Sequence, residues 1–138
     1  MAKRFIDTGI FDDSWFSELS MEAKIFWIWL ITRCNHAGII DINNKLATFQ
    51  TGIKNIPMTL KEIGDRCILI ESGKYFIPKF IYYQYSNGLS ENVSAQKSVI
   101  HILKKYNLEH YIKSISENKK QEIKIEQKPI LEKPKRIW

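Results

Sequence analysis

Three side chains that can bind a metal ion lie close together in the sequence: Cys34, His36 and Asp41. A structural zinc site needs four such ligands, and the C-x-H spacing matches no common zinc pattern. Cys67 is the only other cysteine, and no C-x-x-C motif occurs. We therefore expect no metal site and no other cofactor, and interpret His36 as a turn residue that forms a hydrogen bond at a helix end.

Asp12 and Asp13 are neighbouring carboxylates that could serve acid–base catalysis. They come just before Trp15 and Phe16, where the N-terminus of a short helix favours negative charge and a side-chain cap. Capping explains the pair better than catalysis does. No P-loop, zinc-protease or nucleophile-elbow motif occurs in the sequence. The sequence therefore predicts a protein that is not an enzyme.

The composition favours one globular domain followed by a basic tail. The 138 residues are 44% hydrophobic and 12% aromatic, which is enough for one core. Residues 1–112 hold 13 Lys and Arg against 11 Asp and Glu, and residues 113–138 hold 8 against 4. We predict a domain over residues 1–112. We expect residues 113–138 to form a flexible tail, because charges there alternate with isolated aliphatic residues.

The apolar run at residues 25–31, Ile-Phe-Trp-Ile-Trp-Leu-Ile, predicts a helix that is buried on most of its sides. Ser20 can cap its N-terminus, and Asn35 and Gly38 can end it and turn the chain. The run is too short to cross a membrane, which takes about 20 apolar residues. The N-terminal sequence MAKRF also lacks the apolar stretch of a secretory signal, so we expect a cytoplasmic protein without a membrane partner.

The next elements follow from capping residues. We predict a strand over residues 39–42 and a second helix over residues 45–50, between Asn43 and Gly52. The capping-box sequence T-L-K-E at residues 59–62 predicts the start of a third short helix.

A β-hairpin and a last helix complete the predicted domain. The hairpin strands cover residues 68–71 and 74–82 around a Ser72-Gly73 turn, and Pro78 places the second strand at an edge or breaks it. A helix over residues 90–106 follows. Its apolar face is predicted to hold Ala95, Val99, Ile102, Leu103 and Tyr106.

This order of elements is that of a winged helix-turn-helix. The fold is α+β, with a helical core, a small antiparallel β-hairpin wing and a C-terminal helix. It presents its third helix to the DNA major groove and lays the hairpin along the backbone.

Two stretches also resemble a known family. They are KRFIDTGIFDDSWFSELSMEAKIFWIWLITRCNHAGIIDIN and KYFIPKFIYYQYSNGLSENVSAQKSVIHILKKYNL. Both are similar to the N-terminal winged-helix region of phage replication-initiation proteins, the replisome-organiser or DnaD-like group. The resemblance covers residues 3–109, and CNHAGIID, IPKFIYYQY and SVIHILKKY are its most specific pieces. It implies a DNA-binding domain that recognises origin DNA or helps to load replication machinery.

The predicted DNA contacts lie on the second and third helices, on their connection and on the wing. Hydroxyl, amide and cationic side chains can hold phosphates or read base edges. The candidates are Lys45, Thr48, Gln50, Lys54, Asn55, Thr59, Lys61, Arg66 and Lys74. The alternative is that these residues form an ordinary polar surface. For Lys74 on the wing, the alternative is a turn residue that contacts only water.

We therefore expect double-stranded DNA as the partner and a role in replication initiation or its control. The rival is a protein-interaction module that binds a host or phage protein. The tail ends in KPKRIW, which could dock on such a partner, follow DNA or remain disordered. A two-fold homodimer would let two winged helices reach two half-sites.

The aromatic residues between Tyr75 and Tyr85 could stack on single-stranded nucleic acid, but core packing is the favoured interpretation.

Overall fold

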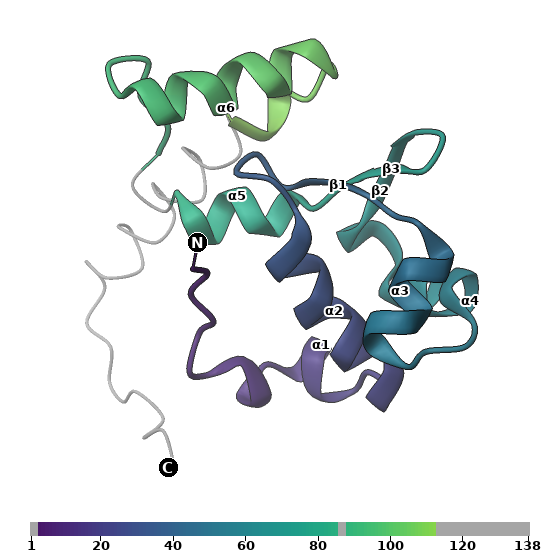
Figure 1. The fold of residues 1–138 in the computed structure, drawn as a ribbon. Coiled ribbons are helices and arrows are strands. Elements are labelled where there is room, and N and C mark those ends of the chain that lie inside the picture. The colour runs from purple at the N-terminus through teal and green to yellow at the C-terminus, as the bar shows by residue number, and fades with distance from the viewer. Residues whose placement is uncertain (1–2, 86–87, 113–138) are drawn as a thin grey trace, which may run out of the picture. The chain divides into compact units, whose positions relative to one another are not determined.

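In the computed structural model, which describes residues 3–85 and 88–112, the apolar run forms the longest helix, α2 (Met21–Arg33; Figure 1). Phe26 is fully buried, as the prediction of a core helix requires. The burial does not extend around the whole helix, because Ile25 remains 45% exposed. The helix therefore lies in the core with one side partly open to solvent.

The chain divides into two compact units, residues 1–83 and residues 84–138. The predicted boundary after residue 112 coincides with the end of the described residues, and the predicted tail lies outside them. The first unit holds, in chain order, η1 (Ile10–Asp12), α1 (Ser14–Ser17), α2, β1 (Ile39–Asp41), α3 (Asn44–Thr51), α4 (Ile56–Ile63), η2 (Gly64–Arg66), β2 (Ile68–Glu71), β3 (Lys74–Phe76) and nearly all of α5 (Pro78–Gln84). The second unit holds α6 (Ser94–Lys105).

The three strands form one antiparallel sheet in the order β1-β3-β2, so the last strand in the sequence is the central one. Phe76 on β3 lies opposite Ile39 on one side and Ile68 on the other. The β2–β3 hairpin turns at Gly73, whose φ of +74° suits the predicted glycine turn. With α2, α3 and α4 packed against one another, the first unit is mixed α+β and is compatible with a winged-helix-like fold (Figure 1).

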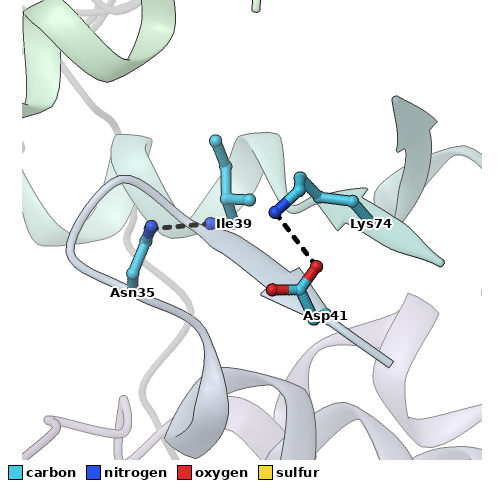
Figure 2. A network of polar contacts seen from close by, with 4 residues as sticks. All are labelled: Asn35, Ile39, Asp41 and Lys74. Carbon is cyan, nitrogen blue, oxygen red and sulfur yellow. Dashed lines mark hydrogen bonds and ion pairs between the residues drawn. The ribbon is translucent and has the colours of Figure 1, made fainter. Parts of the chain in front are cut away.

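The turn from α2 into β1 is built around Asn35 and Gly38, as predicted. The Asn35 side-chain oxygen accepts hydrogen bonds from the amide of Ala37 at 2.9 Å and from the amide of Ile39 at 3.0 Å. Figure 2 shows Asn35 next to Ile39. Gly38 has a φ of +79°, and its carbonyl accepts a hydrogen bond from the Ile77 amide at 2.8 Å. The turn is therefore fixed both locally and to the chain segment that follows β3.

The cap predicted for α3 is confirmed. The Asn43 side chain accepts a hydrogen bond from the Leu46 amide at 3.2 Å. At the other end Gly52 takes the left-handed conformation, with a φ of +80°, and donates to the Thr48 carbonyl at 2.9 Å. The helix therefore covers Asn44–Thr51, one residue longer at each end than predicted.

Of the two alternatives predicted for the second hairpin strand at Pro78, the break is the one found. The strand does not run through residue 82, and the predicted edge position is wrong because β3 is the central strand. β3 ends at Phe76, and the chain enters α5 at Pro78. Proline suits the first turn of a helix, because its fixed φ is helical and its missing N–H would have no partner there. Phe80 and Ile81 turn inward and are buried. Phe76 and Phe80 therefore belong to the core and Tyr75 packs against it, whereas Tyr83 is 60% exposed.

The predicted start of the third helix is also wrong. α4 begins at Ile56, and its N-cap is Asn55, whose side chain accepts a hydrogen bond from the Met58 amide at 3.1 Å. Glu62 does not close a capping box with Thr59. Its two carboxylate oxygens instead accept hydrogen bonds from the amide and the hydroxyl of Ser20, each at 2.7 Å.

Ser20 is the predicted N-cap of α2, and its hydroxyl accepts from the Ala23 amide at 3.1 Å. Glu62 therefore places a negative charge from α4 at the positive end of α2. We expect Glu62→Ala to lower the free energy of unfolding by about 1 kcal/mol, through the lost hydrogen bonds and helix-end charge. Urea unfolding of the full chain measures this loss. Glu18→Ala, which removes an exposed carboxylate without an ion pair among the described residues, should change stability by less than about 0.5 kcal/mol.

In the second unit, α6 begins at Ser94, later than predicted, and ends in a Schellman motif. Asn107 has a φ of +58° and donates to the Lys104 carbonyl, while the Leu108 amide donates to the Leu103 carbonyl at 2.8 Å. The buried positions of α6 are Val99, Ile100 and Leu103. The predicted apolar face is thus displaced, because Ala95 is exposed and Ile100 takes a core position.

Candidate nucleic-acid interface

Helix α3 exposes two of its candidate residues and partly covers a third. Lys45 is exposed, and Thr48 is half-buried. Gln50 is exposed, but its side-chain oxygen accepts a hydrogen bond from the Trp29 indole at 2.9 Å. Lys45 is therefore open to a ligand, whereas Gln50 would have to give up its hydrogen bond to Trp29 and Thr48 is partly covered.

The connection to α4 and the exposed side of α4 hold three further candidates. Lys54 and Lys61 are exposed. Asn55 is exposed as well, and it is engaged as the N-cap of α4. Neither lysine forms an ion pair with another described residue, so both can reach a phosphate, whereas Asn55 would have to give up its role as the cap.

Thr59 was predicted to contact DNA, but the structure buries it. The residue is only 6% exposed, and its hydroxyl donates to the Asn55 carbonyl at 3.0 Å. Burial on the inner side of α4 therefore removes Thr59 from the set of residues that can contact a nucleic acid.

Arg66 and Lys74 each have a partner within the protein. The guanidinium of Arg66 lies over the Trp15 ring, 4.0 Å from its centroid. The Lys74 ammonium lies 3.0 Å from the Asp41 carboxylate, across the β1–β3 pairing (Figure 2). Since the Lys74 side chain is only 23% exposed, we interpret it as part of the sheet rather than as a free phosphate contact of the wing.

We group the exposed lysines and large apolar residues of α3, of α4 and of their connection as one candidate surface, which we call the α3–α4 surface. Its members are Lys45, Leu46, Phe49, Lys54, Met58 and Lys61. Among the residues that the structure describes, none of the three lysines forms an ion pair. The surface therefore carries three positive charges that remain available to a ligand.

Its apolar members are the part that the sequence prediction missed. Phe49 is 86% exposed and Met58 66% exposed, while Ala47 is the only buried residue of α3. Eight residues make only about two helical turns, so the spacing of apolar residues cannot decide which side of such a helix faces inward. The Asn43 cap predicted where the helix starts, but it carries no information on which side of the helix is buried.

The residues considered for metal binding do not form a site. Cys34 is buried and receives a hydrogen bond on its sulfur from Arg4, while Asp41 pairs with Lys74. Within residues 3–85 and 88–112, no three His, Cys, Asp or Glu side chains are grouped to hold a metal ion. Burial raises the pKa of Cys34 to about 11 and that of Cys67 to about 12. Both thiols are therefore protonated at neutral pH, the form that neither attacks nor binds metals well.

Comparisons of the chain with protein-family models, with curated proteins and with solved structures find no match. The resemblance to phage replication-initiation proteins therefore stays a prediction from the sequence. Of the helices in the described part of the chain, none has the length and apolar character needed to span a membrane.

Proposed function

We propose that the protein is a non-catalytic winged-helix DNA-binding protein that acts in phage-type replication initiation or its control. The observation that carries the proposal is that α4, preceded by α3 and followed by the β2–β3 hairpin, exposes Lys61 close to its C-terminal end. In winged-helix proteins the corresponding helix enters the major groove and the preceding helix contacts the backbone. Lys54 and Lys45 lie on the connection and on that preceding helix.

The sheet supports the same proposal. Winged helices place the first strand between the first helix and the two helices of the helix-turn-helix unit, and the hairpin follows the third helix. The order α2-β1-α3-α4-β2-β3 and the antiparallel order β1-β3-β2 agree with this pattern. The hairpin turn is tight and Lys74 is paired with Asp41, so we assign DNA contact to the helices and not to the wing.

Duplex binding should depend on salt with a slope set by three lysines. Neutralising three phosphates predicts that log affinity falls with log salt at a slope of about −2.7. We expect Lys54→Ala with Lys61→Ala to weaken binding at least about tenfold at low salt and to bring the slope near −1. Fluorescence anisotropy of a labelled duplex, titrated with the full chain at several salt concentrations, measures both quantities.

The matched control for this pair is Lys97→Ala with Lys105→Ala, which removes the same charge from exposed positions of α6. A loss of affinity in the control as large as in the α3–α4 pair would contradict the proposed site. A wild-type chain that binds no duplex at low salt would exclude the DNA function itself.

The exposed Phe49 and Met58 favour a second candidate, the protein-interaction module. Aromatic and methionine side chains are enriched at protein interfaces, whereas the phosphate backbone of DNA is contacted mainly by charged and hydrogen-bonding groups. If this candidate is correct, Phe49→Ala abolishes the binding of a protein partner, and Lys54→Ala with Lys61→Ala leaves duplex affinity unchanged.

A further inference from the structure

The N-terminal part of the first unit concentrates negative charge. Residues 5–22, which we call the acidic segment, contain five Asp and Glu and no Lys or Arg, in a chain whose net charge is +6. All five carboxylates are solvent-exposed: Asp7, Asp12, Asp13, Glu18 and Glu22. A basic protein thus contains a segment rich in exposed carboxylates, with Arg66 from η2 as a positively charged neighbour over its Trp15 ring.

Local structure uses only part of this charge. Asp13 caps α1 by accepting from the Phe16 amide, and Asp7 accepts from the Gly9 amide. Asp12 and Glu18 form no ion pair in the part of the chain that the structure describes. The acidic segment therefore has carboxylates to offer to a positively charged partner.

Aromatic side chains accompany these carboxylates. Phe5 is 91% exposed and Phe11 71% exposed, and the Phe11 ring makes an edge contact with the Phe16 ring, with centroids 5.4 Å apart. Two large apolar side chains in water, flanked by charge, are typical of a protein-binding surface. A partner for this segment should therefore combine positive charge with exposed apolar groups.

The α3–α4 surface has both properties. Its lysines at positions 45, 54 and 61 carry charge of the opposite sign, and Phe49 on α3 and Met58 on α4 supply exposed apolar area on the same two helices. No ion pair joins the two surfaces within one copy, as far as the described residues extend. Each surface thus remains available to another molecule.

We propose that the acidic segment of one copy docks on the α3–α4 surface of a second copy. Because two different surfaces meet, the contact is head-to-tail, and each pair keeps one free surface of each kind. This differs from a two-fold dimer, in which both copies use the same residues. The proposal does not require DNA binding, although the second copy would cover the surface assigned to DNA above.

Sedimentation velocity of the nuclease-treated full chain, over a wide range of protein concentration and at two salt concentrations, tests the proposal. We expect concentration-dependent association that weakens as salt rises. Phe49→Ser on one surface and Phe11→Ser on the other should each weaken association at least about tenfold, the effect of removing an interface anchor. Circular dichroism should show that both variants fold, since both side chains are exposed.

Mixing the two variants separates this interface from a symmetric one. Phe49→Ser keeps a working acidic segment and Phe11→Ser keeps a working α3–α4 surface, so a 1:1 mixture should form a dimer that neither variant forms alone. Lys61→Glu should weaken association, whereas Lys97→Glu on α6, with the same charge change, should not. A wild-type chain that stays monomeric at low salt, or a mixture that fails to pair, would overturn the proposal.

Discussion

Gly38→Ala should lower the free energy of unfolding by about 2 to 4 kcal/mol, through backbone strain and a steric clash. Gly38 has a φ of +79°, a conformation that side chains with a Cβ atom rarely adopt. A Cβ added at this position would lie 2.9 Å from the Ile77 carbonyl oxygen. That carbonyl is backbone on the segment between β3 and α5, so it cannot move aside as a flexible side chain could.

Gly52→Ala is the matched control, because Gly52 has nearly the same φ, +80°, with no atom within 4 Å of the added Cβ. In this variant only the strain of the left-handed conformation should lower the free energy of unfolding, by about 1 to 2 kcal/mol. Urea unfolding followed by circular dichroism compares the two. Equal losses would show that the close approach of the Ile77 carbonyl contributes nothing to the effect.

Phe26→Ala should lower the free energy of unfolding by about 3 to 5 kcal/mol, because it leaves a cavity in the core. Phe26 is 0% exposed and stacks on Trp29, with ring centroids 5.5 Å apart and an interplanar angle of 17°. The same urea experiment measures the loss. The neighbouring change Ile25→Ala, at a position 45% exposed on the same helix, should lose about 1 kcal/mol or less.

A loss for Phe26→Ala that is no larger than the loss for Ile25→Ala would contradict the assignment of α2 as the centre of the core. Leu at position 26 offers a further check. Because Leu keeps most of the buried apolar volume, Phe26→Leu should retain more stability than Phe26→Ala.

Local chemistry explains why the starts of α1, α2 and α3 could be predicted. Asp13, Ser20 and Asn43 each cap the helix that follows, because a short side-chain oxygen next to the first free amides stabilises that turn in any context. The predictions at Gly52 and Gly73 also rest on local chemistry, since each glycine adopts a positive φ that other residues rarely adopt. These predictions needed no knowledge of the rest of the fold.

The errors have a tertiary cause. Around Pro78 the sequence is apolar or aromatic except for Lys79, and these residues match the spacing of a helix as well as that of a strand. The periodicity therefore could not distinguish the two. Glu62 fits a local capping box by spacing, but the packing of α4 on α2 gives it Ser20 instead.

The candidate site shows the same limit. The sequence identified the lysines at positions 45, 54 and 61, which are exposed as expected. It could not show that Lys74 faces Asp41 or that Arg66 covers Trp15, because strand register and helix packing bring those pairs together. Phe49 was missed because a short helix carries too little pattern to reveal an exposed aromatic side chain.

The position of β3 in the middle of the sheet has a consequence for how the protein forms during synthesis. Both β1 and β2 precede it in the chain, so neither strand has its partner when it leaves the ribosome. The sheet can close only after residues 74–76 have emerged, and Ile77 and Phe80 follow them into the core. Contacts between distant parts of a chain form late because loop closure costs entropy first. The first unit is therefore expected to fold only when almost all of its 83 residues are available, and not helix by helix.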